Sequence, residues 1–298
     1  MDKINIEHLK KILSYKECFE VVKRFNFPYA IIKGEALSLM AYGELGKRNS
    51  QDIDLLISPK YIGIAKVILN DNGFYYIIKN KYDKVLTISM SHQSPTYIKK
   101  TKISYIYLDL NHSIFWGEYA GKCVDIDTFL EDIIDTEIYG CNMKTLPPIK
   151  MLIQLILHHY KDMNSIFLLA TRKSIKRSMF DDVYFLLKNN LEDIPLDKLY
   201  TLSKFYEIIP FVYYVLYHVG LFFQDETLRE YISAFKTDEG ERLLNCYGLN
   251  DNERREWKCS VTMRLETENL YDLIKDDLTA KDIEKINMNR RVFLGEQQ

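Results

Sequence analysis

The sequence predicts an α+β fold with a mixed sheet in residues 1–146, followed by an α-helical domain in residues 147–298. Short β-branched runs alternate with amphipathic helical patterns in the first part, whereas long apolar helical patterns fill the second. Pro147-Pro148 separates them, and paired prolines stop one element and can occupy the first turn of the next helix. We therefore place the domain boundary at this pair.

The predicted elements follow from apolar periodicity and from the residues that interrupt it. Residues 6–25 indicate an amphipathic helix that ends before Pro28, and the run 28–33 indicates a strand that Gly34 stops. Further elements of the first part are a helix closed by Gly43, a strand at 52–57, a helix at 60–72, strands at 74–79, 84–90 and 103–110, and an acidic helical segment at 129–138. Helices of the second part are expected at 148–161, 179–190, 196–223 with a break at Pro210, and 225–235, before a polar helical tail.

Composition excludes several classes of protein. The 298 residues are 47% hydrophobic and 28% charged, a balance that is typical of globular proteins and not of disordered ones. The net charge of -2 provides no overall field for wrapping nucleic acid or docking on an anionic membrane, so a polyanion would have to bind locally. The most apolar run, 208–223, is too short to span a bilayer and contains Pro210, so we expect no membrane partner.

The cysteines and the amino end favour a reduced, cytoplasmic protein. The 5 cysteines are scattered and form no C-x-x-C pair, which argues against a disulfide framework and a zinc knuckle. Acidic and basic residues are interspersed from residue 2, so the amino end does not resemble a signal peptide.

The segment 28–57 carries the pattern that points to chemistry. A strand that turns at Gly34 into a helix presents free backbone N–H groups to an anion. On the next strand Asp52 and Asp54 project from one face, since side chains alternate along a strand. Asp109 ends a third strand and shares a face with Tyr107. Three carboxylates beside a phosphate-binding turn are what two-metal nucleotidyl transfer requires.

These residues resemble a known family. The run IIKGEALSLMAYGELGKRNSQDIDLLI (31–57) is similar to the signature of uncharacterised-type bacterial nucleotidyltransferases of the DNA polymerase β superfamily. The resemblance continues through LDLNH (108–112), the helical segment with His158-His159, and FDDVYFLL (180–187), and it reaches residue 190. It implies a polymerase-β-like core whose helical second domain forms the other side of a cleft.

The resemblance also implies residue roles. Asp52, Asp54 and Asp109 would be catalytic and would bind two Mg²⁺ ions, or Mn²⁺, and Gly34 would let the backbone approach the phosphates of an NTP. Lys33 and Arg48 would neutralise phosphate charge. Glu35 stands where many superfamily members have serine or glycine, and it belongs to the same nucleotide-binding turn or is a first-turn acid on the helix dipole.

Several alternatives remain open from the sequence. The substrate is expected to be an NTP, ATP by weak preference, and the acceptor a small molecule rather than tRNA or protein. Two alternative hypotheses are a metal-dependent glycosyltransferase and a catalytically silent nucleotide-binding module. A second pair, Asp125 and Asp127, lacks an upstream glycine turn, and a basic cluster lies at 172–177. The roles of His112, His158, His159 and residues 191–298, and the oligomeric state, are not assigned.

Overall fold

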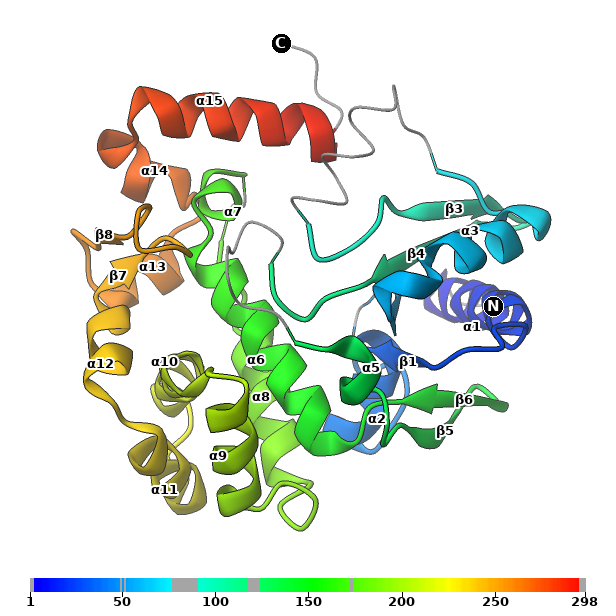
Figure 1. The fold of residues 1–298 in the computed structure, drawn as a ribbon, viewed down its shortest axis with the longest axis horizontal. Helices are drawn as coiled ribbons and strands as arrows, with labels where there is room; N and C mark the ends of the chain where they lie inside the picture. The colour runs from blue at the N-terminus through cyan, green and yellow to red at the C-terminus, as the bar shows by residue number, and fades with distance from the viewer. Residues whose placement is uncertain are drawn as a thin grey trace. The chain divides into compact units, whose positions relative to one another are not determined.

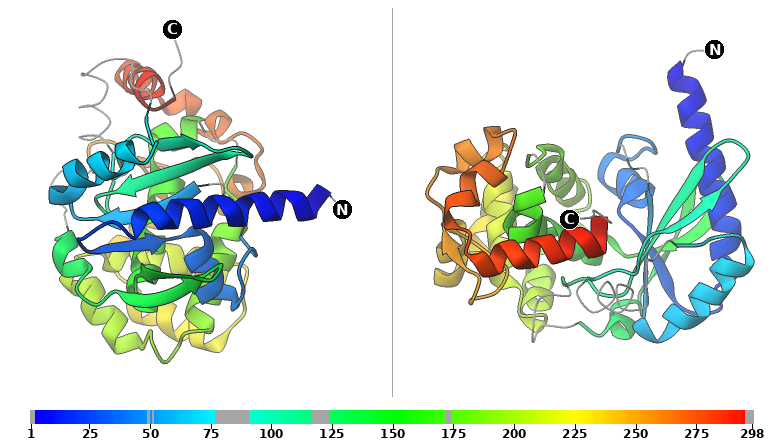
Figure 2. Two further views of the ribbon diagram at one scale, coloured as in Figure 1. Left: turned by 90° about the vertical axis from the view of Figure 1, so that its right-hand side faces the viewer. Right: turned by 90° about the horizontal axis from the view of Figure 1, so that it is seen from above.

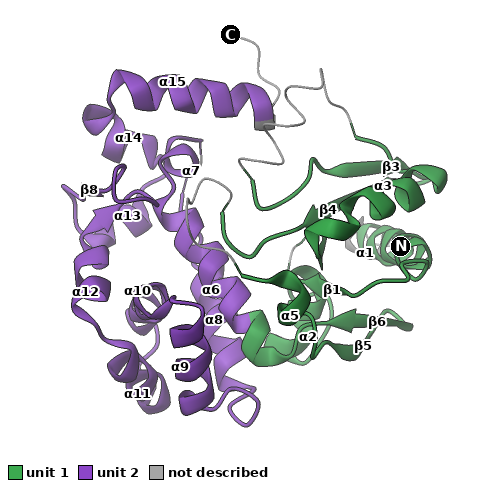
Figure 3. Ribbon diagram, viewed as in Figure 1, with its two compact units in different colours: residues 1–117, 123–151 green, residues 118–122, 152–298 purple. Residues whose placement is uncertain are grey.

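The computed structural model describes residues 3–48, 50, 52–76, 91–116, 124–171 and 174–294 (Figure 1). Contacts divide the chain into two compact units, which Figure 3 colours separately. Unit 1 comprises residues 1–117 and 123–151, and unit 2 comprises residues 118–122 and 152–298. The boundary lies inside helix α6 (Pro148–Asn164), which begins at the second proline of the predicted junction. Among the described helices, none is both long and apolar enough to cross a membrane.

Unit 1 is built on a six-stranded mixed sheet, as the sequence predicted. Its strands are β1 (Tyr29–Ile32), β2 (Asp52–Ile57), β3 (Tyr97–Lys100), β4 (Tyr105–Asn111), β5 (Ile134–Ile138) and β6 (Cys141–Thr145), in the order β3-β4-β2-β1-β6-β5. The pairs β2·β4 and β1·β6 are parallel, and the other pairs are antiparallel. Strand β2 is buried at every position after Asp52, which explains its nearly continuous apolar sequence.

The helices of unit 1 flank this sheet. They are α1 (Lys3–Val22), α2 (Gly34–Tyr42), α3 (Ile62–Asp71) after the 3₁₀ turn η1 (Pro59–Tyr61), and α5 (Ile126–Phe129). Helix α1 contacts β4 and β6 and runs across one face of the sheet, as both views of Figure 2 show. Gly43 ends α2 in a left-handed conformation, with φ of 73°, and its N–H bonds to the Leu39 carbonyl. The glycine stop read from the sequence is therefore a helix C-cap.

One secondary-structure prediction in unit 1 was wrong, and two strands, β3 and β6, were not predicted. The segment 129–138 is not a continuous acidic helix, because Ile134–Ile138 forms β5, which pairs with β6 through a turn at Tyr139 and Gly140. β5 is an edge strand with one buried residue, and its Ile134 and Ile138 also fit the i, i+4 spacing of a helix that begins at Leu130, so the local pattern did not identify it as a strand. Strand β3 was not predicted, although it pairs with β4. The strand predicted at 84–90 and most of that at 74–79 lie outside the described residues.

Unit 2 is predominantly helical. After α6 it contains α7 (Ile166–Thr171), α8 (Ser178–Lys188), α9 (Leu196–Phe205), α10 (Ile209–Gly220), α11 (Glu226–Phe235), α12 (Asp238–Leu244), α13 (Val261–Glu266), α14 (Tyr271–Ile274), the 3₁₀ turn η2 (Lys275–Asp277), α15 (Ala280–Asn289) and the π-helical turn η3 (Arg290–Leu294). A short hairpin joins β7 (Cys246–Tyr247) to β8 (Arg255–Glu256). Helix α10 contacts α8, α9, α11 and α12 and forms the centre of this bundle. Pro210 lies in its first turn, which explains the break between α9 and α10.

Candidate active site

The parallel pairing of β2 with β4 brings two of the predicted acids together. Asp54 and Asp109 are register partners, so their side chains lie on the same face of the sheet. Asp52 precedes Asp54 by two positions and shares that face opposite Tyr107. Asp54 and Asp109 are 5% and 7% exposed, whereas Asp52 is half-buried. Three carboxylates from two neighbouring strands thus face the same side of unit 1.

The charge on Asp109 is disfavoured by its surroundings. Burial, and then repulsion from Asp54, raise the pKa of Asp109 from 3.8 to about 6, although Thr96 and Lys33 act in the opposite direction. Gln93 donates a hydrogen bond to Oδ2 at 3.2 Å. The Oδ1 atom is buried and meets no donor with hydrogen-bond geometry in the described part of the chain. The negative charge of Asp109 is therefore only partly offset by its neighbours, and a bound cation would stabilise it.

Asp54 is compensated by two side chains that the fold brings to it. The Nζ atom of Lys33, which follows β1, lies 3.1 Å from Asp54 Oδ1. Asn111 donates from Nδ2 to the same oxygen at 3.2 Å and to the Leu55 carbonyl at 3.3 Å. Both donors are buried. A cationic group therefore already occupies one side of the carboxylate pair.

The turn between β1 and α2 is tight and conformationally unusual. Lys33 has φ of 58° and ψ of -147°, and Gly34 has φ of 43°. A Cβ atom on Gly34 would lie 3.2 Å from the Tyr15 hydroxyl and 3.6 Å from the Ser50 hydroxyl. The first amides of α2 have no intrahelical partner, and no side chain caps the helix. Glycine is thus required by both the backbone conformation and the close approach of Tyr15.

The Glu35 side chain is buried and contacts two neighbouring segments. Its side chain is fully buried, its Oε1 atom lies 2.5 Å from Lys11 Nζ, and its Oε2 atom accepts the Gly46 N–H at 2.7 Å. These contacts join α2 to α1 and to the loop that follows α2. Both oxygens are thereby held inside unit 1, a geometry that favours the structural alternative over phosphate contact for this residue.

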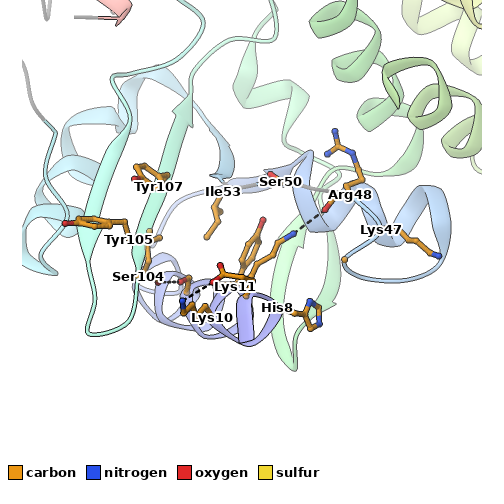
Figure 4. A pocket seen from close by; sticks show the side chains of 15 residues that line it. His8, Lys10, Lys11, Lys47, Arg48, Ser50, Ile53, Ser104, Tyr105 and Tyr107 are labelled. Atoms are coloured by element: carbon orange, nitrogen blue, oxygen red, sulfur yellow. Dashed lines mark hydrogen bonds and ion pairs between the residues drawn. The ribbon is translucent and has the colours of Figure 1, made fainter. Parts of the chain in front are cut away.

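Arg48 lies on the loop after α2 and lines a pocket. The pocket has a volume of about 490 Å³ and is lined by Glu7, His8, Lys10, Lys11, Ser14, Tyr15, Gly46, Lys47, Arg48, Ser50, Ile53 and residues 104–107. Figure 4 shows Lys11 of α1 reaching toward the backbone of Arg48, whose carbonyl it contacts at 3.3 Å. Ser50 connects this loop to the acids, because its hydroxyl donates to Asp52 Oδ1 at 3.0 Å.

The structure also shows what sequence reasoning missed. Asn111 and Gln93 contact the acids, yet neither was singled out as a site residue. A signal for Asn111 was present, because it stands two positions after Asp109 and so shares its face on β4. Gln93 follows residues 77–90, which lie outside the described chain, and no local pattern identifies it.

Other residues noted in the sequence lie in different surroundings. Asp125 caps α5, and Asp127 pairs with Lys60 at 2.8 Å, so the second Asp-x-Asp has structural contacts. His112 is partly buried, and burial lowers its pKa. Of the basic cluster, Arg172 and Lys173 lie outside the described residues.

A different group meets the strict spacing of a metal site. Among the described residues, His158, His159 and Asp162 form the one group of three such side chains whose ligand atoms all lie within 4.8 Å of one another. Asp52, Asp54 and Asp109 do not form such a group among the described residues, and Lys33 pairs with Asp54 at 3.1 Å.

Two solved structures match the chain at low sequence identity and with TM-scores below 0.5. A crystal structure of ANT(2")-Ia in complex with adenylyl-2"-tobramycin matches with a TM-score of 0.40 at 12% identity, covering 66% of this chain and 97% of that chain. A crystal structure of an antigenic nucleotidyltransferase-like protein from Paracoccidioides brasiliensis matches with a TM-score of 0.41 at 14% identity. It covers 76% of this chain and 93% of that chain. A comparison with curated protein sequences gives no match.

The match to a family model is the broader finding. The model of the uncharacterised nucleotidyltransferase family covers residues 5–224, which include the whole six-stranded sheet, the Gly34 turn and helices α6 to α10. Together with the mixed sheet that carries the acids on β2 and β4, this match places the chain in the uncharacterised nucleotidyltransferase family.

Proposed function

We propose that this protein transfers an NMP from a magnesium-bound NTP to an acceptor hydroxyl and releases pyrophosphate. The observation that carries the proposal is the register pairing of Asp54 with Asp109 on β2 and β4, next to the Gly34 turn. Membership of the family supports the reaction class. ATP is the weakly preferred nucleotide, and a small molecule is preferred to tRNA or protein as acceptor.

Asp52, Asp54 and Asp109 are the residues that would hold the metal. The buried, uncompensated Oδ1 atom of Asp109 and the ammonium group already bound to Asp54 show that the donor set accommodates positive charge. Carboxylate oxygens are the ligands that Mg²⁺ prefers, and Mn²⁺ accepts the same ligands. When bound, two such ions neutralise the triphosphate and lower the pKa of the attacking hydroxyl.

The chain's own residues then bind and orient the substrates. The first amides of α2 and the Gly34 turn receive phosphate oxygens, since an N-terminal helix turn favours anions. Lys33, released from Asp54, and Arg48 offset the charge on the departing pyrophosphate. Asp109 completes the metal site or, as the alternative role, accepts the proton that leaves the acceptor hydroxyl. Glu35 positions the loop that carries Arg48.

The decisive measurement is the release of pyrophosphate by the full chain, which is first stripped of metal and then assayed with and without added metal. Each of the four NTPs would be supplied with Mg²⁺ or Mn²⁺ and with hydroxyl-bearing small molecules or tRNA as acceptor. We expect metal-dependent release, and we expect Asp54→Asn or Asp109→Asn to reduce it at least ~10²-fold.

The second Asp-x-Asp provides the matched control. Asp127→Asn makes the same chemical change at a residue paired with Lys60, and it should retain activity. NTP binding without turnover under all conditions would support the silent module instead. Release of a nucleoside diphosphate from UDP-sugars would support the glycosyltransferase. Full activity in both active-site variants would rule out the assigned acids.

A further inference from the structure

A second cluster of potential metal ligands lies on a single helix of unit 2. His158, His159 and Asp162 project from α6, and one ligand atom from each lies within 4.8 Å of the other two. Residues three and four positions apart face the same side of an α-helix, which explains how this short segment gathers three ligands. His159 and Asp162 are 4% and 5% exposed.

The geometry of one pair already matches a coordination sphere. His158 Nε2 lies 3.3 Å from Asp162 Oδ2. In a tetrahedral site with metal–ligand bonds of ~2.0–2.1 Å, two ligand atoms are separated by about 3.4 Å. The spacing of these two atoms is therefore that of two ligands of one ion, and a ligand atom of His159 lies within 4.8 Å of both.

The surroundings of the cluster are arranged for a cation. Lys161 Nζ lies 3.4 Å from Asp162 Oδ1 and 3.4 Å from His158 Nδ1. A buried carboxylate needs positive charge nearby, and here the ammonium group supplies it. Lysine is long and flexible, so a metal ion with the same preference for the carboxylate can displace it.

From these contacts we propose that His158, His159 and Asp162 form a binding site for a divalent transition-metal ion, with Zn²⁺ as its representative. Two imidazoles and one carboxylate suit Zn²⁺ and similar ions, whereas Mg²⁺ prefers oxygen ligands alone. The fourth position is left for water. The site consists of unit 2 residues and shares none with Asp52, Asp54 and Asp109, so the proposal does not depend on the function proposed for those acids.

Equilibrium dialysis with Zn²⁺, followed by elemental analysis, tests the proposal on the tag-free full chain. The background is Asp52→Asn/Asp54→Asn, which removes carboxylates that could bind the ion elsewhere. We expect one equivalent of Zn²⁺ per chain and a Zn²⁺-dependent rise in Tm. Asp162→Asn and His159→Gln should each weaken binding by at least about tenfold. His8→Gln removes an exposed histidine of α1 and should leave binding unchanged.

Lys161→Met separates a metal site from a purely structural ion-pair cluster. Removing the competing ammonium should tighten Zn²⁺ binding by about threefold or more. This variant also decides the matter if His159→Gln or Asp162→Asn fails to fold. No bound Zn²⁺ in the parent chain, equal binding after His159→Gln, or unchanged or weaker binding after Lys161→Met would each overturn the proposal.

Discussion

The two units bury charged groups in contrasting ways. In unit 1, Lys33, Asp54, Asp109 and Asn111 come from three separate segments and meet only because β1, β2 and β4 are neighbours in the sheet. In unit 2, the cluster around Asp162 comes from consecutive turns of α6. The first arrangement leaves Asp109 poorly compensated, whereas the second places a cation and an imidazole beside its acid. A site assembled from separate strands can contain a carboxylate, here Asp109, whose negative charge is not offset by a cation nearby in the sequence.

Replacing the lysine of each cluster should give the largest difference between the units. Lys33→Met leaves the buried Asp54 carboxylate without its cation and should lower the free energy of unfolding of unit 1 by about 3 kcal/mol. Lys161→Met should cost less than half of that, because His158 Nε2 still lies 3.3 Å from Asp162 Oδ2. Trp116 and Trp257 lie in different units, so fluorescence of the single-tryptophan variants Trp257→Phe and Trp116→Phe reports each unit separately in urea. Equal losses would contradict the contrast.

A buried histidine makes unit 2 sensitive to acid. Burial lowers the pKa of His218 to about 4 from 6.5, so the folded state resists a proton that the unfolded state accepts. The stability that neutral His218 preserves is fully present above pH 6.5 and is lost as the pH falls toward 4, by up to about 3 kcal/mol. His218→Gln should flatten this loss, as measured by urea unfolding of unit 2 at pH 7, 5.5 and 4.5. An unchanged slope would show that other groups govern it.

Asp109 should give the stability of unit 1 a pH dependence of the opposite sign. Its folded pKa of about 6 exceeds the unfolded 3.8, so protonation stabilises the fold. This contribution is fully present below pH 3.8 and is lost as the pH rises through 6. Asp109→Asn should therefore stabilise the metal-free unit 1 at pH 7 by about 1–2 kcal/mol and have little effect near pH 4. Urea unfolding at both pH values checks this, and destabilisation at pH 7 would contradict it.

Glu35→Gln should have the smallest effect and separates a structural role from phosphate contact. The amide oxygen can still accept the Gly46 N–H, while the ion pair with Lys11 is lost. We expect a stability loss of about 1 kcal/mol and NTP affinity within about threefold of the parent chain. Lys11→Met tests the same pair from its other side. A tenfold loss of NTP affinity at unchanged stability would indicate that Glu35 contacts the nucleotide.

Strand parity and glycine stops account for most of what the sequence predicted about unit 1. Alternation on β2 and β4 placed Asp52, Asp54 and Asp109 on one face before their pairing was known. The same reasoning could not give the partner of each acid, because Lys33 reaches Asp54 only through the antiparallel register of β1 with β2. It also failed for β5, whose short edge segment has apolar residues that fit a helix as well as a strand. The local sequence pattern therefore could not predict the contacts between segments that are distant in the sequence.

The parallel register of Asp54 with Asp109 has a consequence for how the protein folds. Parallel neighbours need a crossover connection, and here it spans everything between β2 and β4, so the entropy of closing that long loop must be overcome before the two acids meet. Helix α6 gathers its own cluster on the time scale of helix formation, which is about a microsecond. In refolding experiments, recovery of nucleotide binding should consequently lag behind recovery of helical circular dichroism. A nascent or partly refolded chain would thus possess its helices before it possesses a working centre.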